Sequence, residues 1–252
     1  MPRFFIRKEQ ITDNVITLRG DDAHHVARSL RMAVGQTITV CDMQGNEYSC
    51  RISGFDEDKE VYADVLEVVS SNNEPPCRIR LFQALSKGDK LDTVIQKAVE
   101  CGVSEIIPFE SERCVVRIKD DAEERKTERR RRIAAEAAKQ CGRSILPDVL
   151  PTVSFDEALR LASQSRVGLF CYEGDGTEQI GRVLDEYLIC DENGNYPDVS
   201  VMIGSEGGFS LKEAERAKQA GMIPTGLGKR ILRTETAPVF ALSCIVCKVE
   251  LS

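Results

Sequence analysis

No stretch of the sequence approaches the roughly 20 apolar residues that a helix needs to cross a membrane. Its first segment, MPRFFIRK, has neither the long apolar core nor the small-residue cleavage site of a secretory signal. We therefore expect a cytoplasmic protein with no membrane partner. In that reducing compartment the 10 cysteines should remain thiols.

The sequence also lacks the spacing of a metal site. Cys244 and Cys247 form a CxxC motif, but no second such motif is present to complete a zinc site. Most cysteines lie in apolar runs, such as Leu169–Cys171, and an unmodified cysteine packs like a small hydrophobic residue. We therefore expect core packing for both cysteines of the motif, and no metal.

Basic residues are fewer than acidic ones, with 34 Lys and Arg against 41 Asp and Glu, which gives a formal net charge of −7. That balance alone argues against nucleic-acid binding, because phosphate contacts need Lys and Arg. The field at one face of a protein matters more than the sum, however, so local clusters decide. With 42% hydrophobic and 30% charged residues, the 252 residues are typical of one or two globular domains.

The first part of the chain is predicted to form short strands around one helix. The expected helix begins with Asp21 or Asp22 as its cap and runs through Arg31. Five strands with one helix suggest a small barrel. The polar segment SSNNEPP at 70–76 ends this part, so we expect domains at 1–72 and 73–252. The five extended runs are 3–7, 15–19, 37–42, 47–55 and 61–69.

After residue 76 strands and helices alternate, which predicts a doubly wound α/β domain. The runs at 166–172 and 199–204 are almost continuously apolar, as in central strands of a parallel sheet covered on both faces. Ser154 and Ser210 each open a capping box at the start of a helix. Further strands are expected at 78–85 and 104–109, and further helices at 90–101, 122–141 and 235–249.

A glycine-rich bend joins the apolar strand at 199–204 to the helix that Ser210 begins. In a parallel α/β sheet this transition lies at the carboxyl ends of the strands, where ligands bind. Glycines let a ligand approach the backbone closely. The bend, IGSEGGF at 203–209, therefore predicts a ligand site, and a tight turn without a ligand is the alternative.

A second glycine-containing segment, GLGKRILRTETAP at 226–238, also joins an extended run to a helix. Ile231 and Leu232 lie among its charges, which favours packing against a flat ligand over a plain charged loop. The phosphate-binding patterns GxGxxG and GxxxxGK[ST] are absent, so a nucleotide polyphosphate is disfavoured. S-adenosylmethionine, which is held by backbone amides and apolar contacts, suits the two segments better.

Basic residues gather locally in two places. The arginines at 129–132 lie on an expected helix, where consecutive residues point in different directions, so some should pair with Glu124, Glu128 or Glu136. Arg28 and Arg31 are three residues apart on the other expected helix and should share a face. These clusters are compatible with an RNA-facing surface or with a solvated charged face.

Ordered segments across nearly the whole chain resemble SPOUT-class uracil-N3 methyltransferases of 16S ribosomal RNA. The segments are PRFF at 2–5, HHVARSLR at 24–31, KGDK at 87–90, QKAVECGV at 96–103, SER at 111–113, EAAKQCGR at 136–143, IGSEGGF at 203–209 and LGKRILRTETA at 227–237. One departure is Ser205, which stands where the family usually carries proline and does not fix φ as proline does.

The resemblance implies a PUA-like barrel that helps grip RNA, and an α/β domain with a deep trefoil knot. It implies a homodimer that methylates N3 of a uridine in 16S ribosomal RNA, either naked or in the small subunit, with S-adenosylmethionine as cofactor. The cofactor residues that it implies are Tyr172, Glu173, Ile203, Gly204, Ser205, Glu206, Gly207, Leu227, Gly228, Arg230, Ile231, Leu232, Arg233, Thr236 and Ala237. The RNA-binding residues are Arg3, His25, Arg28, Arg31, Arg113, Gln140 and Arg143.

For catalysis, the N3–H of uracil must lose its proton before or during attack. Glu206 or Glu235 could take the proton, while Arg233 or Arg113 could stabilise the developing anion. The alternative is that both carboxylates only brace loops. Two other classes of function remain open: an RNA-binding or ribosome-assembly factor without catalysis, and a small-molecule enzyme with another nucleotide.

Overall fold

The computed structural model describes residues 1–56, 60–117 and 120–251. The chain divides into two compact units. The first comprises Met1–Glu74 with Ala138–Leu146, and the second comprises Pro75–Ala137 with Pro147–Ser252.

A six-stranded sheet forms the first unit, in the order β1-β4-β5-β6-β3-β2. β1 pairs in parallel with β4, and the other pairs are antiparallel. The five predicted strands are confirmed, and β2 is a short addition at the sheet edge that two residues were too few to reveal. The strands are β1 (Arg3–Phe5), β2 (Ile11–Thr12), β3 (Val15–Leu18), β4 (Thr37–Cys41), β5 (Asn46–Phe55) and β6 (Val61–Ser70).

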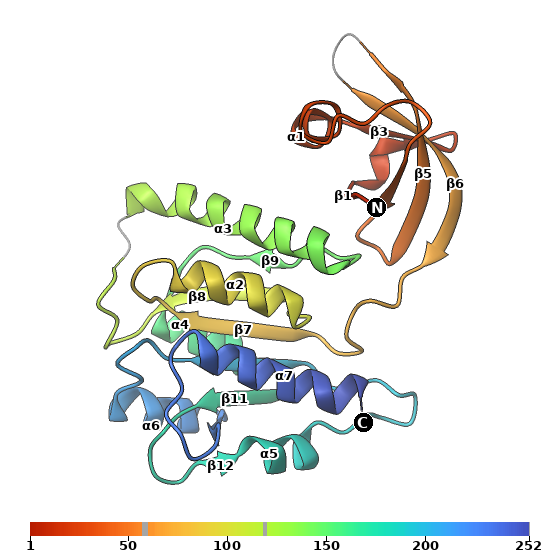
Figure 1. The fold of residues 1–252 in the computed structure, drawn as a ribbon. Helices are drawn as coiled ribbons and strands as arrows, with labels where there is room; N and C mark the ends of the chain where they lie inside the picture. Colours follow the sequence, from red (N-terminus) through yellow and green to blue (C-terminus); the bar gives the residue numbers. More distant parts are fainter. Residues whose placement is uncertain (57–59, 118–119, 252) are drawn as a thin grey trace. The chain divides into compact units, whose positions relative to one another are not determined.

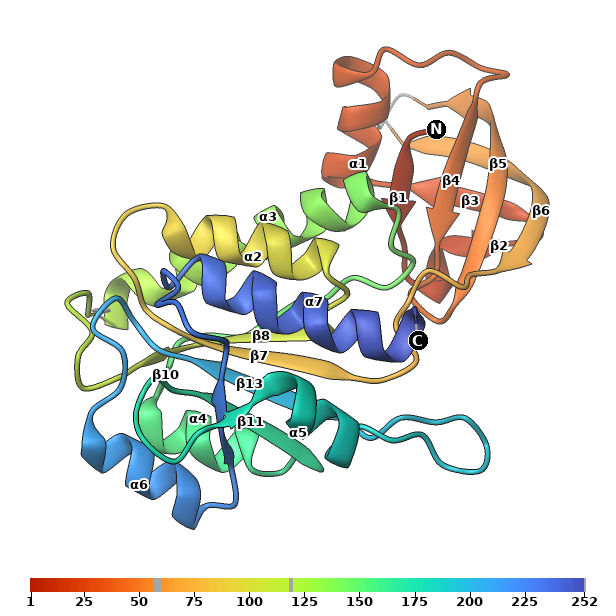
Figure 2. The same cartoon turned by 60° about the horizontal axis from the view of Figure 1, so that its bottom comes forward.

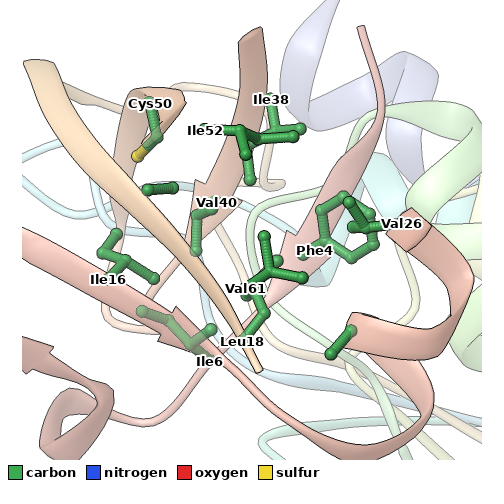
Figure 3. Close-up of a cluster of buried hydrophobic side chains, with 12 residues drawn as sticks. Phe4, Ile6, Ile16, Leu18, Val26, Ile38, Val40, Cys50, Ile52 and Val61 are labelled. Atoms are coloured by element: carbon green, nitrogen blue, oxygen red, sulfur yellow. The ribbon is translucent and has the colours of Figure 1, made fainter. Parts of the chain in front are cut away.

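Figure 3 shows the core of this unit, where apolar side chains from the strands meet the helix that follows β3. Phe4 is 1% exposed, and its ring meets that of His25 edge-on, with centroids 6.3 Å apart. Lys139 Nζ lies 5.6 Å from the centroid of the same ring. Buried residues alternate with less buried ones along β3 and along the first four residues of β4, the period of two that a half-buried strand requires.

The predicted helix ending at Arg31 is wrong in its length and its cap. α1 (Gly20–His24) has Arg19 as its N-cap, and a π-helical turn at His25–Ser29 continues it. Arg31 then has a φ of +51°. The N–H of Met32 donates to the carbonyl of Val26 (3.0 Å), and the Val26 side chain is buried. The helix therefore ends at this bond, with Arg31 in the left-handed conformation before it. Arg28 and Arg31 therefore do not share a helical face.

A parallel sheet forms the centre of the second unit, in the order β10-β8-β7-β13-β11-β14-β12, with β9 paired to β8. Every residue of β13 and all but the last residue of β11 are buried, which confirms that 166–172 and 199–204 form central strands covered on both faces. β7 is also fully buried. The strands are β7 (Ile79–Ala84), β8 (Glu105–Glu110), β9 (Asp148–Val149), β10 (Val153–Ser154), β11 (Val167–Cys171), β12 (Glu178–Gln179), β13 (Val199–Ile203) and β14 (Ile223–Gly226).

Helices cover both faces of this sheet (Figures 1 and 2). α2 and α7 lie side by side on one face, and α4 packs on the other. The apolar stripe predicted for α2 is confirmed by burial at Leu91, Val94, Ile95, Ala98 and Val99. The helices are α2 (Lys90–Glu100), α3 (Asp120–Cys141), α4 (Phe155–Ala162), α5 (Ile180–Tyr187), α6 (Leu211–Gln219) and α7 (Thr236–Glu250).

The capping box predicted at Ser210 is confirmed, but the one predicted at Ser154 forms only in half. Ser210 accepts from the N–H of Glu213, and the Glu213 side chain accepts from the Ser210 N–H, which completes a capping box. Ser154 likewise accepts from the N–H of Glu157, while the Glu157 carboxylate pairs with Arg160. Local sequence thus sets where α4 and α6 begin, and so fixes the chain direction just after the glycine-rich bend.

Candidate cofactor site

A cavity of about 830 Å³ opens at the carboxyl ends of β11, β13 and β14. Its wall comes from three segments: the end of β11, the glycine-rich bend after β13, and the segment that leads from β14 to α7. The position is the one that ligands occupy in open α/β sheets, and the size suits a small organic molecule. The three segments predicted to form a pocket are thus brought to one cavity.

Backbone geometry explains the glycines of the bend. The N–H of Gly208 donates to the carbonyl of Ser205 (2.9 Å), and Gly208 has a φ of +65°. A Cβ on Gly204 would lie 3.1 Å from backbone atoms of Gly208, closer than most real contacts. A side chain at Gly204 would therefore open the bend, which is a reason for glycine that is independent of any ligand.

A buried hydrogen-bond chain ties the third segment to the bend. The Thr234 hydroxyl donates to the carbonyl of Gly204 (2.8 Å) and accepts from the amide of Gln83 (3.1 Å). Gln83, in β7, is 0% exposed, and Thr234 is 6% exposed. Sequence reasoning missed both residues. The signals in the sequence were weak: Gln83 is a polar residue within an apolar strand, and Thr234 is an uncharged residue between Arg233 and Glu235.

Of the predicted cofactor residues, only Thr236 is absent from the described lining, and it is the first residue of α7. Ile231 is 81% exposed, so an apolar side chain at the cavity stands open to solvent. The role of these residues in binding a cofactor stays a prediction. The fourteen predicted cofactor residues that line the cavity are Tyr172, Glu173, Ile203, Gly204, Ser205, Glu206, Gly207, Leu227, Gly228, Arg230, Ile231, Leu232, Arg233 and Ala237.

Lys90, in the first turn of α2, joins two carboxylates at the cavity wall. Its Nζ lies 2.9 Å from Glu206 Oε1 and 4.0 Å from Glu235 Oε2. Burial alone would raise the pKa of Glu206, but hydrogen bonds from Lys90 and from backbone N–H groups, including that of Lys87 (3.1 Å), outweigh it and hold this pKa below its ordinary value. Sequence reasoning gave Lys90 no role, although it lies within KGDK.

Three arginines add positive charge to the cavity lining. The guanidinium of Arg113 donates to the carbonyl of Gly207 (2.9 Å), which places a predicted RNA-binding residue at the cavity. Arg230 and Arg233 also line the cavity, and within the described part of the chain neither has an acidic partner. These cations are available to an anionic ligand.

The other six predicted RNA-binding residues belong to the first unit. Arg3 forms an ion pair with Glu47 (2.7 Å). Arg143 is 4% exposed, and its Nε donates to Glu74 (3.1 Å). His25, Arg28, Arg31 and Gln140 are exposed. Two of the six are therefore held by internal ion pairs. RNA contact at any of them stays a prediction.

The arginine run on α3 is occupied by internal contacts. Arg129 pairs with Asp92, and Arg132 pairs with Glu128 (3.2 Å), one of the predicted partners. Arg130 is 6% exposed and pairs with Glu123 (3.2 Å), which was not expected. The remaining member, Arg131, donates to the carbonyl of Val149 (3.0 Å).

All ten cysteines lie within the described residues, and each is a thiol. Cys244 is half-buried. Cys247 is exposed, so the prediction of core packing was wrong for this residue, which is not among the buried positions of α7. Within the described ranges, no three His, Cys, Asp or Glu side chains gather as metal ligands. The helices in these same ranges are too short or too polar to cross a membrane.

The fold and the cavity define a two-domain α/β protein with a small-molecule site at the carboxyl edge of a parallel sheet. This chain belongs to the RNA methyltransferase family. The RNA methyltransferase domain of that family matches residues 73–246, and its RNA methyltransferase PUA domain matches residues 18–66. The first unit is thus a PUA-like sheet, and the second is a parallel α/β domain typical of SPOUT methyltransferases.

Full-length relatives share both domains. Ribosomal RNA small subunit methyltransferase E of Bacillus subtilis is 35% identical, covering 100% of this chain and 98% of the relative. The Synechocystis protein of the same name is 30% identical, covering 98% and 78%. A crystal structure of the Neisseria gonorrhoeae protein of that name, bound to S-adenosyl methionine, has a TM-score of 0.82 and 31% identity, covering 97% of this chain and 96% of that one.

Proposed function

We propose that this protein transfers the methyl group of S-adenosylmethionine to N3 of a uridine in 16S ribosomal RNA. The observation that carries the proposal is the single cavity lined by the ends of β11 and β13 and by the segment before α7. The names of the full-length relatives, and the cofactor bound to one of them, support the substrate and the donor.

The cavity fits this cofactor on its own chemistry. Gly204 and Gly207 expose backbone to the cavity, and Leu227, Ile231 and Leu232 supply apolar surface for a ring. The Ser205 hydroxyl is buried, and no described group hydrogen-bonds to it, so a ligand could supply its partner. We propose that the fourteen lining residues, with Thr236 behind them, hold the cofactor.

The bound sulfonium supplies an electrophilic methyl carbon. The chain then has to hold the uracil ring in line with it and accept the N3 proton. Arg113 and Arg233, at the cavity rim, are placed to stabilise the charge that develops on the base. Glu206 and Glu235 line the same cavity and are the carboxylates available for the proton.

The PUA-like domain, which we place at 1–72, serves as an RNA grip for the methyltransferase domain at 73–252. His25, Arg28, Arg31 and Gln140 present exposed polar groups for it. Arg3 and Arg143 act by holding Glu47 and Glu74 in place. The target base has to leave its stack to enter the cavity, as in other enzymes that modify a base.

We further propose a cytoplasmic homodimer whose α/β domain is a deep trefoil knot. The support is the family resemblance, together with the hydrogen bonds of Thr234 that hold the segment before α7 against the glycine-rich bend. Sedimentation equilibrium tests the dimer directly: a mass independent of concentration and equal to one chain of 28.0 kDa would refute it.

The proposed function is tested first by calorimetric titration with S-adenosylmethionine, using ATP and NAD as controls. We expect selective binding of S-adenosylmethionine that Gly228→Val weakens, because Gly228 has a φ of +105° that a β-branched residue resists. Transfer of a labelled methyl group to 16S ribosomal RNA, naked and within small subunits, then identifies the substrate. Absence of binding with and without RNA would exclude the methyltransferase, and binding of RNA alone would favour an assembly factor.

A further inference from the structure

Glu206 and Glu235 differ in how their carboxylates are used. Glu206 Oε1 accepts two hydrogen bonds, from Lys90 Nζ (2.9 Å) and from the backbone N–H of Lys87 (3.1 Å). Glu235 Oε2 is buried, and among the described residues no group donates a hydrogen bond to it. Its nearest cation, Lys90 Nζ, lies at 4.0 Å, which is beyond hydrogen-bonding distance.

The carboxylate of Glu235 does not cap its own helix either. It is the N-cap residue of α7, yet its side chain makes no capping hydrogen bond. A buried acceptor without a partner is costly and rare in folded proteins. Because Glu235 lines the cavity, a ligand there can supply the missing donor.

We propose that Glu235, and not Glu206, accepts the proton that the target uridine loses from N3, and that Lys90 positions the two carboxylates for these separate roles. This inference rests on the proposed function. Glu206 is the brace: through Lys90 and the Lys87 N–H it ties the glycine-rich bend to the start of α2. Glu235 is the catalytic residue, because its Oε2 has no hydrogen-bond partner of its own and can accept the proton of a substrate bound in the cavity.

The N3–H bond breaks, and its proton moves to Glu235 Oε2. The electron pair left on N3 forms the new bond to the methyl carbon, while the bond from that carbon to sulfur breaks and its pair stays on sulfur. The products are N3-methyluridine, S-adenosylhomocysteine and protonated Glu235, which returns its proton to water.

The charges around Glu235 favour this division of labour. Lys90 reaches it from α2, and Arg233 lies two residues earlier on the same segment. Arg113 also lines the cavity and donates a hydrogen bond to the carbonyl of Gly207 in the glycine-rich bend. The other charged groups of the lining are Glu173, Glu206, Lys229 and Arg230. Cations therefore outnumber carboxylates around the cavity, which stabilises a uracil anion formed during proton transfer.

The decisive experiment compares Glu235→Gln with its matched control Glu206→Gln in single-turnover methyl transfer at saturating cofactor and RNA. We expect Glu235→Gln to slow transfer by about 100-fold or more, the usual contribution of a general base, with cofactor Kd and thermal stability unchanged. Glu206→Gln should slow it by less than about tenfold, because a partly exposed ion pair contributes little.

Three outcomes would overturn the inference: equal loss in the two variants, a larger loss in Glu206→Gln, or a Glu235→Gln variant that weakens cofactor binding without slowing transfer. Lys90→Met should reduce the rate without raising the KM for cofactor, and Lys90→Arg should restore most of it; no reduction in Lys90→Met would refute the positioning role. If the wild type neither binds cofactor nor transfers methyl, the proposed function itself fails, which is a distinct result.

Discussion

Two basic regions of this chain look alike in sequence and differ in structure. On α3, the arginines at 129–132 are held by Asp92, Glu123, the Val149 carbonyl and Glu128. Between β14 and α7, Lys229, Arg230 and Arg233 line the cavity, and inside the described ranges they have no acidic partner.

The difference follows from the helix. Four consecutive helical residues point around the whole axis, so each meets a different partner: Glu123 and Glu128 on α3 itself, and Asp92 and the Val149 carbonyl outside it. The segment between β14 and α7 is not helical, and the hydrogen bond of Thr234 holds it against the glycine-rich bend. Its cations can therefore all face the cavity. The denser run of basic residues, on α3, is therefore the weaker sign of ligand binding. The variants below distinguish the structural role of the α3 arginines from the binding role of the segment before α7.

The largest effect is expected at the buried end of the α3 run. Arg130→Ala leaves Glu123 buried without its cation and also removes a hydrogen bond to Thr152 (3.0 Å). Breaking such a pair costs about 3–5 kcal/mol, so the melting temperature should fall by roughly 10 °C. Cofactor affinity should stay unchanged at a temperature where the variant is folded. A melting temperature equal to that of the wild type would show that the pair is not structural.

Gly204→Val should act on the cavity instead. A Cβ at this position already lies 3.1 Å from Gly208, and two further methyl groups push the bend apart. We expect the Kd for S-adenosylmethionine to rise by about 100-fold, the range for a misplaced binding loop. Gly181→Ala in α5, where a Cβ meets nothing within 4 Å, is the matched control. Unchanged calorimetric affinity in Gly204→Val would remove the bend from the site.

RNA binding by the variants Arg230→Ala and Arg132→Ala compares an exposed arginine of the segment before α7 with an exposed arginine of α3. Removal of one phosphate contact should weaken RNA binding several-fold and lower the slope of log K against log salt by about 0.7 for single-stranded RNA. We expect that change for Arg230 and none for Arg132, whose contact is with Glu128. Filter binding across a salt series measures both slopes. The reverse result would make α3 the RNA surface.

The smallest effect concerns pH. The pKa of Glu206 is lower in the folded protein than its ordinary value, as hydrogen bonds to the carboxylate outweigh burial. Its contribution to stability is therefore complete above that ordinary value, about 4.5, and is lost as pH falls through the lower folded value. Glu206→Gln should flatten the acid side of a plot of melting temperature against pH. Parallel curves for variant and wild type would contradict the shift.

Sequence reasoning succeeded where the signal is local. The five buried positions of α2 follow the helical period, and the capping box at Ser210 is a contact three residues apart. It failed at the helix near Arg31, because the end of that helix is set by burial of Val26 and by the path into β4, which no local pattern encodes.

The site divides in the same way. Sequence by itself determined the alternating strands and helices, the glycine bend and the segment before α7, because spacing and side-chain type act over a few residues. Only the tertiary structure decided that Lys90 joins Glu206 to Glu235, that Gln83 and Thr234 hold the bend, and that Arg129 and Arg131 of α3 find partners outside the helix. The contacts at the cavity link residues that are close only because the carboxyl ends of parallel strands meet at one edge of the sheet.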